Sequence, residues 1–184
     1  MAQTDSLESL ETGLVVPVPE VQEVVEKWRT RAETTPPVGI FSHISLLYPF
    51  VPPPEADEHL EELERFFGAE TAFDFTLTDV GWFGREVVYL RPEPIDLFRS
   101  LSDRISRHWP DYQPYGGAHE EPIPHVTIGD GGDPSAMTEI AREAAELLPI
   151  ECRADAVWLM VGRPQPPTWS VKARFALGPF SPPG

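Results

Sequence analysis

A four-residue pattern occurs twice in this chain and constrains its fold more than any other feature. Residues 43–46 read His-Ile-Ser-Leu, and residues 125–128 read His-Val-Thr-Ile. In an extended strand, successive side chains point to opposite faces of the sheet. Each copy therefore predicts a strand with a histidine and a hydroxyl on one face and two apolar side chains on the other. Two such pairs, facing each other across a cleft, are suited to grip one phosphate group from both sides.

The pattern taken once carries little information, because serine and threonine are common residues. The other three histidines lack it, since His59, His108 and His119 are followed at the second position by glutamate, proline and glutamate. The interpretation therefore depends on the surroundings of the two copies.

Both copies lie at the same place in a repeated order of elements: helix, motif strand, helix, strand, strand. In the first half we expect helices at 20–31 and around 60–67 and strands at 72–80 and 87–90. In the second half we expect a helix at 95–108, a helix opened by Asp133 as N-cap with Pro134 at its first position, and strands at 150–161 and 169–177.

This order predicts an α+β fold: bilobal, with duplicated helix–strand–helix–strand–strand units and mainly antiparallel sheets flanking a central cleft. Residues 1–184 are expected to form a single domain of two pseudo-symmetric lobes that share the cleft. The sequence halves run from about 12 to 92 and from 93 to 178, and an exchange of strands between the lobes is left open.

The strings H-I-S-L-L-Y-P-F and P-H-V-T-I, with V-G-W-F-G-R-E-V-V-Y-L between them, resemble the two-histidine phosphoesterase superfamily. More narrowly they resemble its 2′-5′ RNA ligase-like, cyclic phosphodiesterase branch. The resemblance implies a bilobal α+β protein that acts on phosphodiesters without a metal. Members often follow the second motif with a small residue and an arginine, whereas here Gly129 is followed by Asp130. An anion thus replaces a cation that is able to hold phosphate.

Histidine is the side chain whose ordinary pKa suits both proton removal and proton donation near neutral pH. We therefore expect His43 and His125 to be catalytic, and the hydroxyls of Ser45 and Thr127 to bind the substrate phosphate. By resemblance, His43 is the general acid and His125 the general base; the residues themselves do not assign those roles.

Tyr115, on the long loop before His125, and Lys172, on the polar face of the last strand, are candidates for the rim of the cleft. Loop packing and a solvated charge are the alternatives for these two. Tyr48 is expected to be a core residue, on the face opposite His43.

A metal site built from His43, His125 and Asp130 is the weaker interpretation, because such ligands on separate strands are a poor metal signature. Asp130 is better explained as a turn residue before two glycines. We therefore expect no metal and no cofactor.

The formal net charge of −16 argues against a long nucleic-acid footprint, since duplex binding depends on Lys and Arg at the phosphates. Cys152 is the single cysteine, which rules out a disulfide framework within the chain and favours a reducing cytoplasm. The first residues lack the basic start and apolar core of a secretory signal, and no apolar run approaches membrane-spanning length. We expect a cytoplasmic monomer that does not bind a membrane.

The function expected from motifs and resemblance together is a metal-independent hydrolase acting on a small cyclic phosphodiester or on the 2′,3′-cyclic phosphate end of an RNA, as in RNA processing. Its partner would be a cyclic nucleotide or an RNA 3′-end rather than a long duplex. Two alternatives stay open: a 2′-5′ RNA ligase, and a non-catalytic module that binds nucleotides or phosphate.

Overall fold

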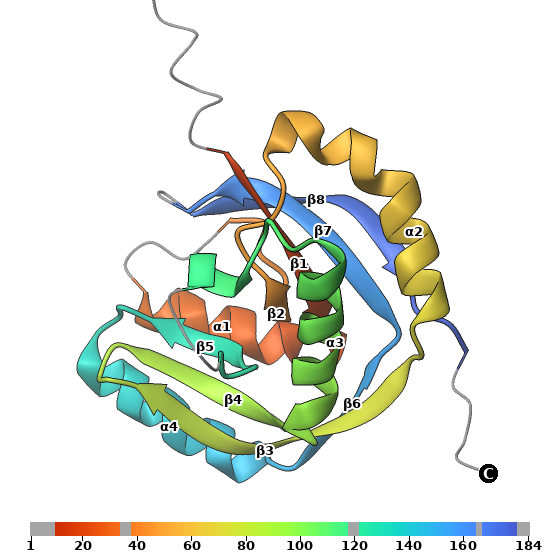
Figure 1. The fold of residues 1–184 in the computed structure, drawn as a ribbon. Coiled ribbons are helices and arrows are strands. Elements are labelled where there is room, and N and C mark those ends of the chain that lie inside the picture. The colour runs from red at the N-terminus through yellow and green to blue at the C-terminus, as the bar shows by residue number, and fades with distance from the viewer. Residues whose placement is uncertain (1–9, 34–37, 118–121, 165–166, 180–184) are drawn as a thin grey trace, which may run out of the picture.

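A computed structural model describes residues 10–33, 38–117, 122–164 and 167–179 of the 184-residue chain, without the side chain of Tyr115. Within these ranges the chain forms an α+β fold, as the sequence predicts, with eight strands in one sheet and four α-helices (Figure 1). The strands are β1 Glu11–Pro17, β2 His43–Leu47, β3 Phe73–Phe83, β4 Val87–Glu93, β5 Val126–Asp130, β6 Ile150–Ala154, β7 Ala156–Arg163 and β8 Thr168–Ala176.

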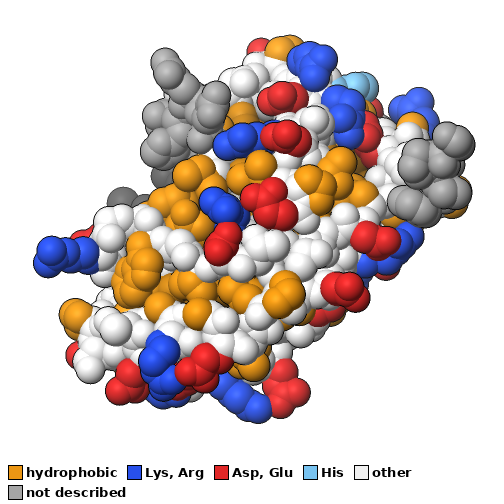
Figure 2. Space-filling view, turned by 90° about the horizontal axis from the view of Figure 1, so that it is seen from below, with side chains coloured by type: hydrophobic (Ala, Val, Ile, Leu, Met, Phe, Trp, Pro, Cys, Tyr) orange, Lys and Arg blue, Asp and Glu red, His pale blue; other side chains and the backbone are white. Residues whose placement is uncertain are grey.

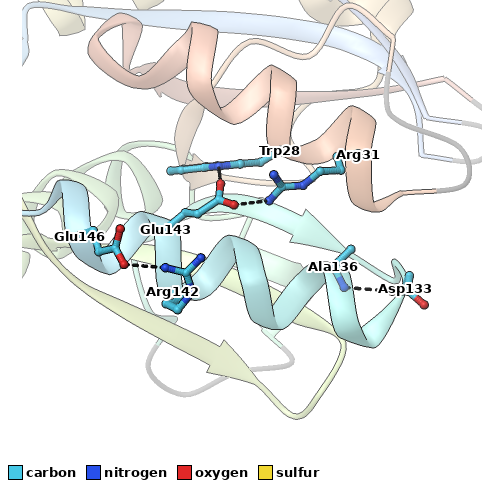
Figure 3. A network of polar contacts seen from close by, with 7 residues as sticks. All are labelled: Trp28, Arg31, Asp133, Ala136, Arg142, Glu143 and Glu146. Carbon is cyan, nitrogen blue, oxygen red and sulfur yellow. Dashed lines mark hydrogen bonds and ion pairs between the residues drawn. The ribbon is translucent and has the colours of Figure 1, made fainter.

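The α-helices are α1 Gln22–Ala32, α2 Leu60–Ala69, α3 Ile95–His108 and α4 Pro134–Leu147. Three short 3₁₀-helices accompany them: η1 Pro19–Val21, η2 Pro53–His59 and η3 Pro114–Gly117. The N-cap expected at Asp133 is confirmed, because its Oδ2 accepts a hydrogen bond of 2.9 Å from the backbone N–H of Ala136. This contact is drawn at the start of α4 in Figure 3.

The strand order across the sheet is β6-β3-β4-β5-β2-β1-β7-β8, and every neighbouring pair is antiparallel. We expected sheets in the plural, but one curled sheet runs through the described part of the molecule (Figure 1). The two motif strands, β2 and β5, are its central neighbours. Their ladder contains a single pair, Ile44 opposite Val126, so the sheet is weakly joined at its middle.

The expected strand at 150–161 is wrong in one respect, because the structure divides this stretch into β6 and β7. Asp155 lies between them, and its carbonyl accepts a hydrogen bond from the Leu177 N–H. Before Asp155 the chain pairs with β3, and after it the chain pairs with β1 on the other side of the motif strands. A change of partner strand requires a break that the continuous apolar pattern does not reveal.

The helix before each motif strand packs mainly on the other motif strand: α1 lies against β5, and α3 lies against β2. Both helices bury side chains at the same spacing, which is Val25, Trp28 and Ala32 in α1 and Phe98, Leu101 and Ile105 in α3. Residues three and four apart share one face of a helix, so each helix presents one apolar stripe to the sheet.

Helix α1 is also fastened to α4 by polar contacts (Figure 3). The Trp28 indole N–H donates to Glu143 at 2.9 Å, and the Arg31 guanidinium lies 3.1 Å from the other oxygen of that carboxylate. These contacts, together with the buried stripe, fix the position of α1 relative to β5.

Candidate active site

The register of β2 and β5 places the two motifs side by side. Because the strands are antiparallel and centred on Ile44 and Val126, His43 lies toward Thr127, and Ser45 lies toward His125. The central pair is fully buried, whereas all four polar residues are half-buried. Alternation along the strands puts both histidines and both hydroxyls on one face, as expected.

Each histidine makes the same backbone contact. Nδ1 of His43 lies 2.6 Å from the Phe41 carbonyl, and Nδ1 of His125 lies 2.6 Å from the Ile123 carbonyl, two residues back in both cases. A carbonyl oxygen only accepts hydrogen bonds, so Nδ1 must be the protonated, donating nitrogen. Both rings therefore hold the same tautomer, and Nε2 is the nitrogen left for proton exchange.

The two rings differ in how their surroundings affect protonation. Burial lowers the pKa of His43 from 6.5 to about 4, and the charges of Arg29 and His125 act in the same direction. Burial also lowers the pKa of His125, but no nearby cation adds to the shift. His43 is thus the imidazole that is harder to protonate.

A cavity of about 460 Å³ opens beside His43 and Ser45. Apolar and aromatic side chains form one part of its wall, among them Val15, Met160 and Trp169. A smaller cavity of about 100 Å³ is lined by both His43 and Thr127, and a third of about 340 Å³ is lined by Ser45 and the loop that precedes His125. The polar face of the two motifs therefore borders space that a small ligand can enter.

The hydroxyls of Ser45 and Thr127 have no hydrogen-bond partner among the described residues. Both hydroxyl oxygens are exposed to solvent, because neither belongs to the described side-chain atoms that are buried without a hydrogen-bond partner. They are free to donate to an oxygen of a bound group.

An ion pair that the sequence does not predict lies beside His43. Arg29 of α1 binds Glu33 through Nε at 2.8 Å and through Nη2 at 3.3 Å, and their side chains are 15% and 4% exposed. The backbone N–H of Asp130 donates to the same Glu33 carboxylate at 2.9 Å. The four-residue spacing was the available signal, but such pairs are common on exposed helices. What gives this pair its place is the docking of β5 on α1.

The loop after β5 comes very close to the end of α1, which explains Gly132. The Asp133 N–H donates to the Ala32 carbonyl at 3.0 Å. A Cβ on Gly132 would lie 2.5 Å from that carbonyl oxygen, so a side chain there would push the loop away. The turn role expected of Asp130 is not observed, because Asp130 is the last residue of β5, paired with Val87, and the bend begins at Gly131. Asp130 also lines the cavity beside His43.

An aromatic pair lies beside His125. The rings of Phe83 and Tyr89 stack at 4.3 Å between centroids, and His125 lies 4.9 Å from the first and 5.2 Å from the second. Tyr89 covers the backbone of Gly81, where a Cβ would meet its ring at 2.3 Å. Glycine at this position therefore lets the aromatic pair form against the histidine.

The remaining candidates are placed differently from the motif residues. Lys172 pairs with Asp57 on η2 at 2.8 Å and is not among the described residues that line the cavity beside His43. Tyr115 belongs to η3, but its side chain lies outside the described part of the structure. Tyr48, expected in the core, lines that cavity instead and makes an edge contact with Trp169. The reason is that β2 ends at Leu47, so strand alternation no longer governs Tyr48.

Within the described ranges, no three His, Cys, Asp or Glu side chains come together in a way that could hold a metal ion. His43, His125 and Asp130 are therefore not joined as a ligand set there.

No helix in those ranges is long and apolar enough to cross a membrane. Figure 2 shows Lys and Arg side chains interspersed with Asp and Glu over one face of the molecule, with hydrophobic side chains between them.

Comparison with known proteins agrees with this arrangement. The family model described as "2'-5' RNA ligase superfamily" matches residues 17–165. The chain therefore belongs to the 2′-5′ RNA ligase superfamily, within the two-histidine phosphoesterases, which confirms the resemblance seen in the sequence. Membership supports an enzyme.

Solved structures with the same fold include TT0787 of Thermus thermophilus, at a TM-score of 0.61 and 17% identity, covering 93% of this chain and 100% of that one. Escherichia coli LigT complexed with 3'-AMP matches at a TM-score of 0.59 and 20% identity, covering 91% and 97%. A structure described as a phosphoesterase matches at 0.54 and 20%, covering 91% and 98%. None of the curated proteins compared with the chain matches it.

Proposed function

We propose that this protein is a phosphoesterase that hydrolyses a small cyclic phosphodiester, or the 2′,3′-cyclic phosphate end of an RNA, by general acid–base catalysis without a metal. The observation that carries the proposal is the matched pair of Nδ1–H contacts to backbone carbonyls. They give both motif histidines a fixed tautomer with Nε2 free, which is what an acid–base pair requires. Membership of the superfamily and the 3'-AMP bound to LigT support a nucleotide-sized substrate.

In the proposed reaction, water attacks the phosphorus of the cyclic diester and one P–O bond to the ribose breaks. His43, in its neutral form, takes the proton of the water at Nε2. His125, in its charged form, gives its Nε2 proton to the departing ribose oxygen. The carbonyls of Phe41 and Ile123 accept from Nδ1 of the two rings and stabilise each ring when it is charged. Ser45 and Thr127 donate to the non-bridging oxygens.

This assignment of roles reverses the one that the family resemblance suggests. It follows from the surroundings of the rings, because burial lowers the pKa of His43 to about 4 and Arg29 adds to this shift, whereas no cation adds to the shift of His125. A base should be the member of the pair that stays neutral more readily, and an acid the member that is protonated more readily.

The proposal is tested by incubating the purified protein with 2′,3′-cyclic AMP and following release of AMP by chromatography. We expect multiple turnovers that survive exhaustive treatment with EDTA, and no turnover by the His43→Ala/His125→Ala variant. Loss of activity with EDTA and its recovery with a divalent ion would instead support the metal interpretation.

The 2′-5′ RNA ligase remains a second candidate, because the matching family model carries that description. The same acid–base pair can run the transfer in the opposite direction when a ribose hydroxyl replaces water. Joining of RNA ends with 2′,3′-cyclic phosphate and 5′-hydroxyl termini would favour the ligase. Binding of 2′,3′-cyclic AMP without any turnover would favour a non-catalytic module.

A further inference from the structure

Both motif hydroxyls and the His43 imidazole line the cavities, but the second motif lacks the cation that related proteins often place after it. Asp130 occupies that position, and its exposed carboxylate lines the cavity beside His43. A phosphodiester carries one negative charge, which must be held close to the two Nε2 atoms for the reaction to occur. A cation from another element is therefore needed.

We infer that Arg29 of α1 supplies this cation and binds the substrate phosphate. The inference rests on the proposed function, since it names the residue that holds the phosphate in that same site. Arg29 lines the large cavity together with His43 and Ser45, and it also lines the small cavity together with His43 and Thr127. Arg29 thus borders both cavities that adjoin His43, on the side where both motif hydroxyls lie.

The contacts of Arg29 leave part of its guanidinium unused. Nε and Nη2 are engaged by Glu33, and Nη1 has no partner among the described residues. A guanidinium presents five N–H donors in a rigid plane, so fixing one edge on Glu33 orients the remaining donors. Bidentate donation to phosphate oxygens is the geometry that arginine favours over lysine.

Glu33 positions Arg29 rather than binding substrate. Its carboxylate is almost fully buried and receives both Arg29 and the Asp130 N–H. Burial raises the pKa of Glu33, and the ion pair with Arg29 offsets this shift only in part. The Asp130 N–H links the pair to the end of β5, the strand that also carries His125 and Thr127. The position of the cation is thereby tied to the second motif, although α1 belongs to the first half of the chain.

A cation at this place also adds to the difference between the two imidazoles. Burial is the main cause of the lowered pKa of His43, and Arg29 lowers it further, which helps to keep this ring neutral and ready to accept a proton. When a phosphate anion binds between Arg29 and His43, its negative charge offsets the positive charge of the guanidinium. The same residue would therefore hold the substrate and keep the base unprotonated before binding.

The inference is tested with a variant that removes the pair without leaving a buried charge. Arg29→Gln alone would leave Glu33 buried and unpaired, a change that typically costs about 3–5 kcal/mol of stability. In Arg29→Gln/Glu33→Gln the net charge is unchanged, and residue 33 can still accept the Asp130 N–H. The matched control is Glu23→Gln/Lys27→Gln, which removes another i,i+4 pair of the same helix, with side chains 87% and 70% exposed.

We expect kcat/KM for 2′,3′-cyclic AMP to fall about 100-fold in the Arg29/Glu33 variant and to stay within about twofold of wild type in the control. Binding of inorganic phosphate, measured by calorimetry, should weaken by about tenfold or more. The pKa of His43, followed by NMR, should rise in the Arg29/Glu33 variant and stay unchanged in the control. Arg29→Lys, which keeps the charge but loses the planar fork, should lose about tenfold in kcat/KM.

A folded Arg29/Glu33 variant that retains both its phosphate affinity and its kcat/KM within about twofold of wild type would overturn the inference. If that variant does not fold, the same comparison of phosphate affinity and kcat/KM is made with Arg29→Lys. If the wild-type protein turns over no cyclic phosphodiester, the proposed function fails. The calorimetric titration with phosphate then tests separately whether Arg29 binds phosphate. Phosphate binding that disappears in the variant supports the site, and binding that is equal in both, or absent from the wild type, refutes it.

Discussion

The surroundings of His43 and His125 show what the two halves of this molecule share and where they differ. Both rings donate from Nδ1 to the carbonyl two residues back, so the strand geometry of the motif is the same. Around His43 burial is the main influence on the pKa, and the nearby charge of Arg29 adds to it. Around His125 they are the aromatic rings of Phe83 and Tyr89.

This difference separates the chemistry of two otherwise similar imidazoles. A matched pair with equal pKa values would not favour one direction of proton transfer, whereas unequal surroundings assign an acid and a base. The equivalent of Arg29 in α3, judged by the spacing of the buried stripe, is Ser102, which lines the cavity on the Ser45 side. One charge difference between the halves, Arg29 against Ser102, therefore arises on the helices that pack on the motif strands.

The largest effect should follow removal of either imidazole. His43→Ala and His125→Ala should each lower kcat for 2′,3′-cyclic AMP by about 10²- to 10⁴-fold, because each removes general acid or base assistance. The double variant should lose less than the product of the two single effects if the pair acts as a unit. Steady-state kinetics on folded variants provides the test. Near-normal kcat in both single variants would make the motifs a scaffold and favour the binding module.

A smaller or comparable effect should follow loss of either hydroxyl. Ser45→Ala and Thr127→Ala each remove one donor to a charged phosphate, which costs at most about 10²- to 10³-fold in kcat. Because both donors lie on the same face of adjoining strands, we expect similar losses. A loss for one hydroxyl alone would show that the phosphate lies nearer to one motif than to the other.

Much of this architecture could be predicted from sequence, because local signals coincide with element boundaries. The helix expected at 95–108 is observed as α3 Ile95–His108, bounded by Pro94 and by the Trp109-Pro110 step. The motif strands were predictable because a histidine and a hydroxyl two residues apart share one strand face. The N-cap at Asp133 was predictable because aspartate before proline has a specific role at a helix start.

The remainder depends on contacts between distant segments. Nothing in the alternation of residues 150–161 signals the change of partner strand at Asp155. Arg29 carries no local mark of its place beside His43, because that place results from the packing of α1 on β5. Tyr48 was assigned to the core because alternation was extended past the end of β2. These errors concern tertiary pairing, which periodicity does not encode.

On the His125 side, Gly81→Ala should disturb the aromatic pair. The added methyl group would overlap the Tyr89 ring, and such overpacking typically costs about 1–3 kcal/mol of stability. We expect thermal unfolding at a lower temperature, and an altered NMR titration of His125 with that of His43 unchanged. Gly68→Ala is the control, since a Cβ there meets nothing within 4 Å and alanine favours a helix. Equal shifts of both histidines would contradict the separation of the two environments.

On the His43 side, Asp130→Asn should have the smallest effect. Its carboxylate lines the cavity and repels a doubly charged phosphomonoester more than a singly charged diester. Removing that charge should tighten inhibition by 2′-AMP or 3′-AMP by about three- to tenfold, with little change in KM for the cyclic diester. Inhibition constants measured side by side test this. Equal tightening for diester and monoester would show that Asp130 does not discriminate between them.

The pH dependence of kcat/KM for 2′,3′-cyclic AMP is the sharpest test of acid–base catalysis by the two histidines, because this parameter reports the ionisation of the free protein. His43 must be neutral, so the rate should fall as the pH drops through about 4. His125 must be protonated, so the rate should also fall as the pH rises through its lowered pKa. We expect a bell-shaped profile with its maximum below pH 6.5, from which His43→Ala removes the acid limb and His125→Ala the alkaline limb. Removal of the opposite limbs would reverse the assigned roles, and a bell left intact in both variants would contradict acid–base catalysis by this pair.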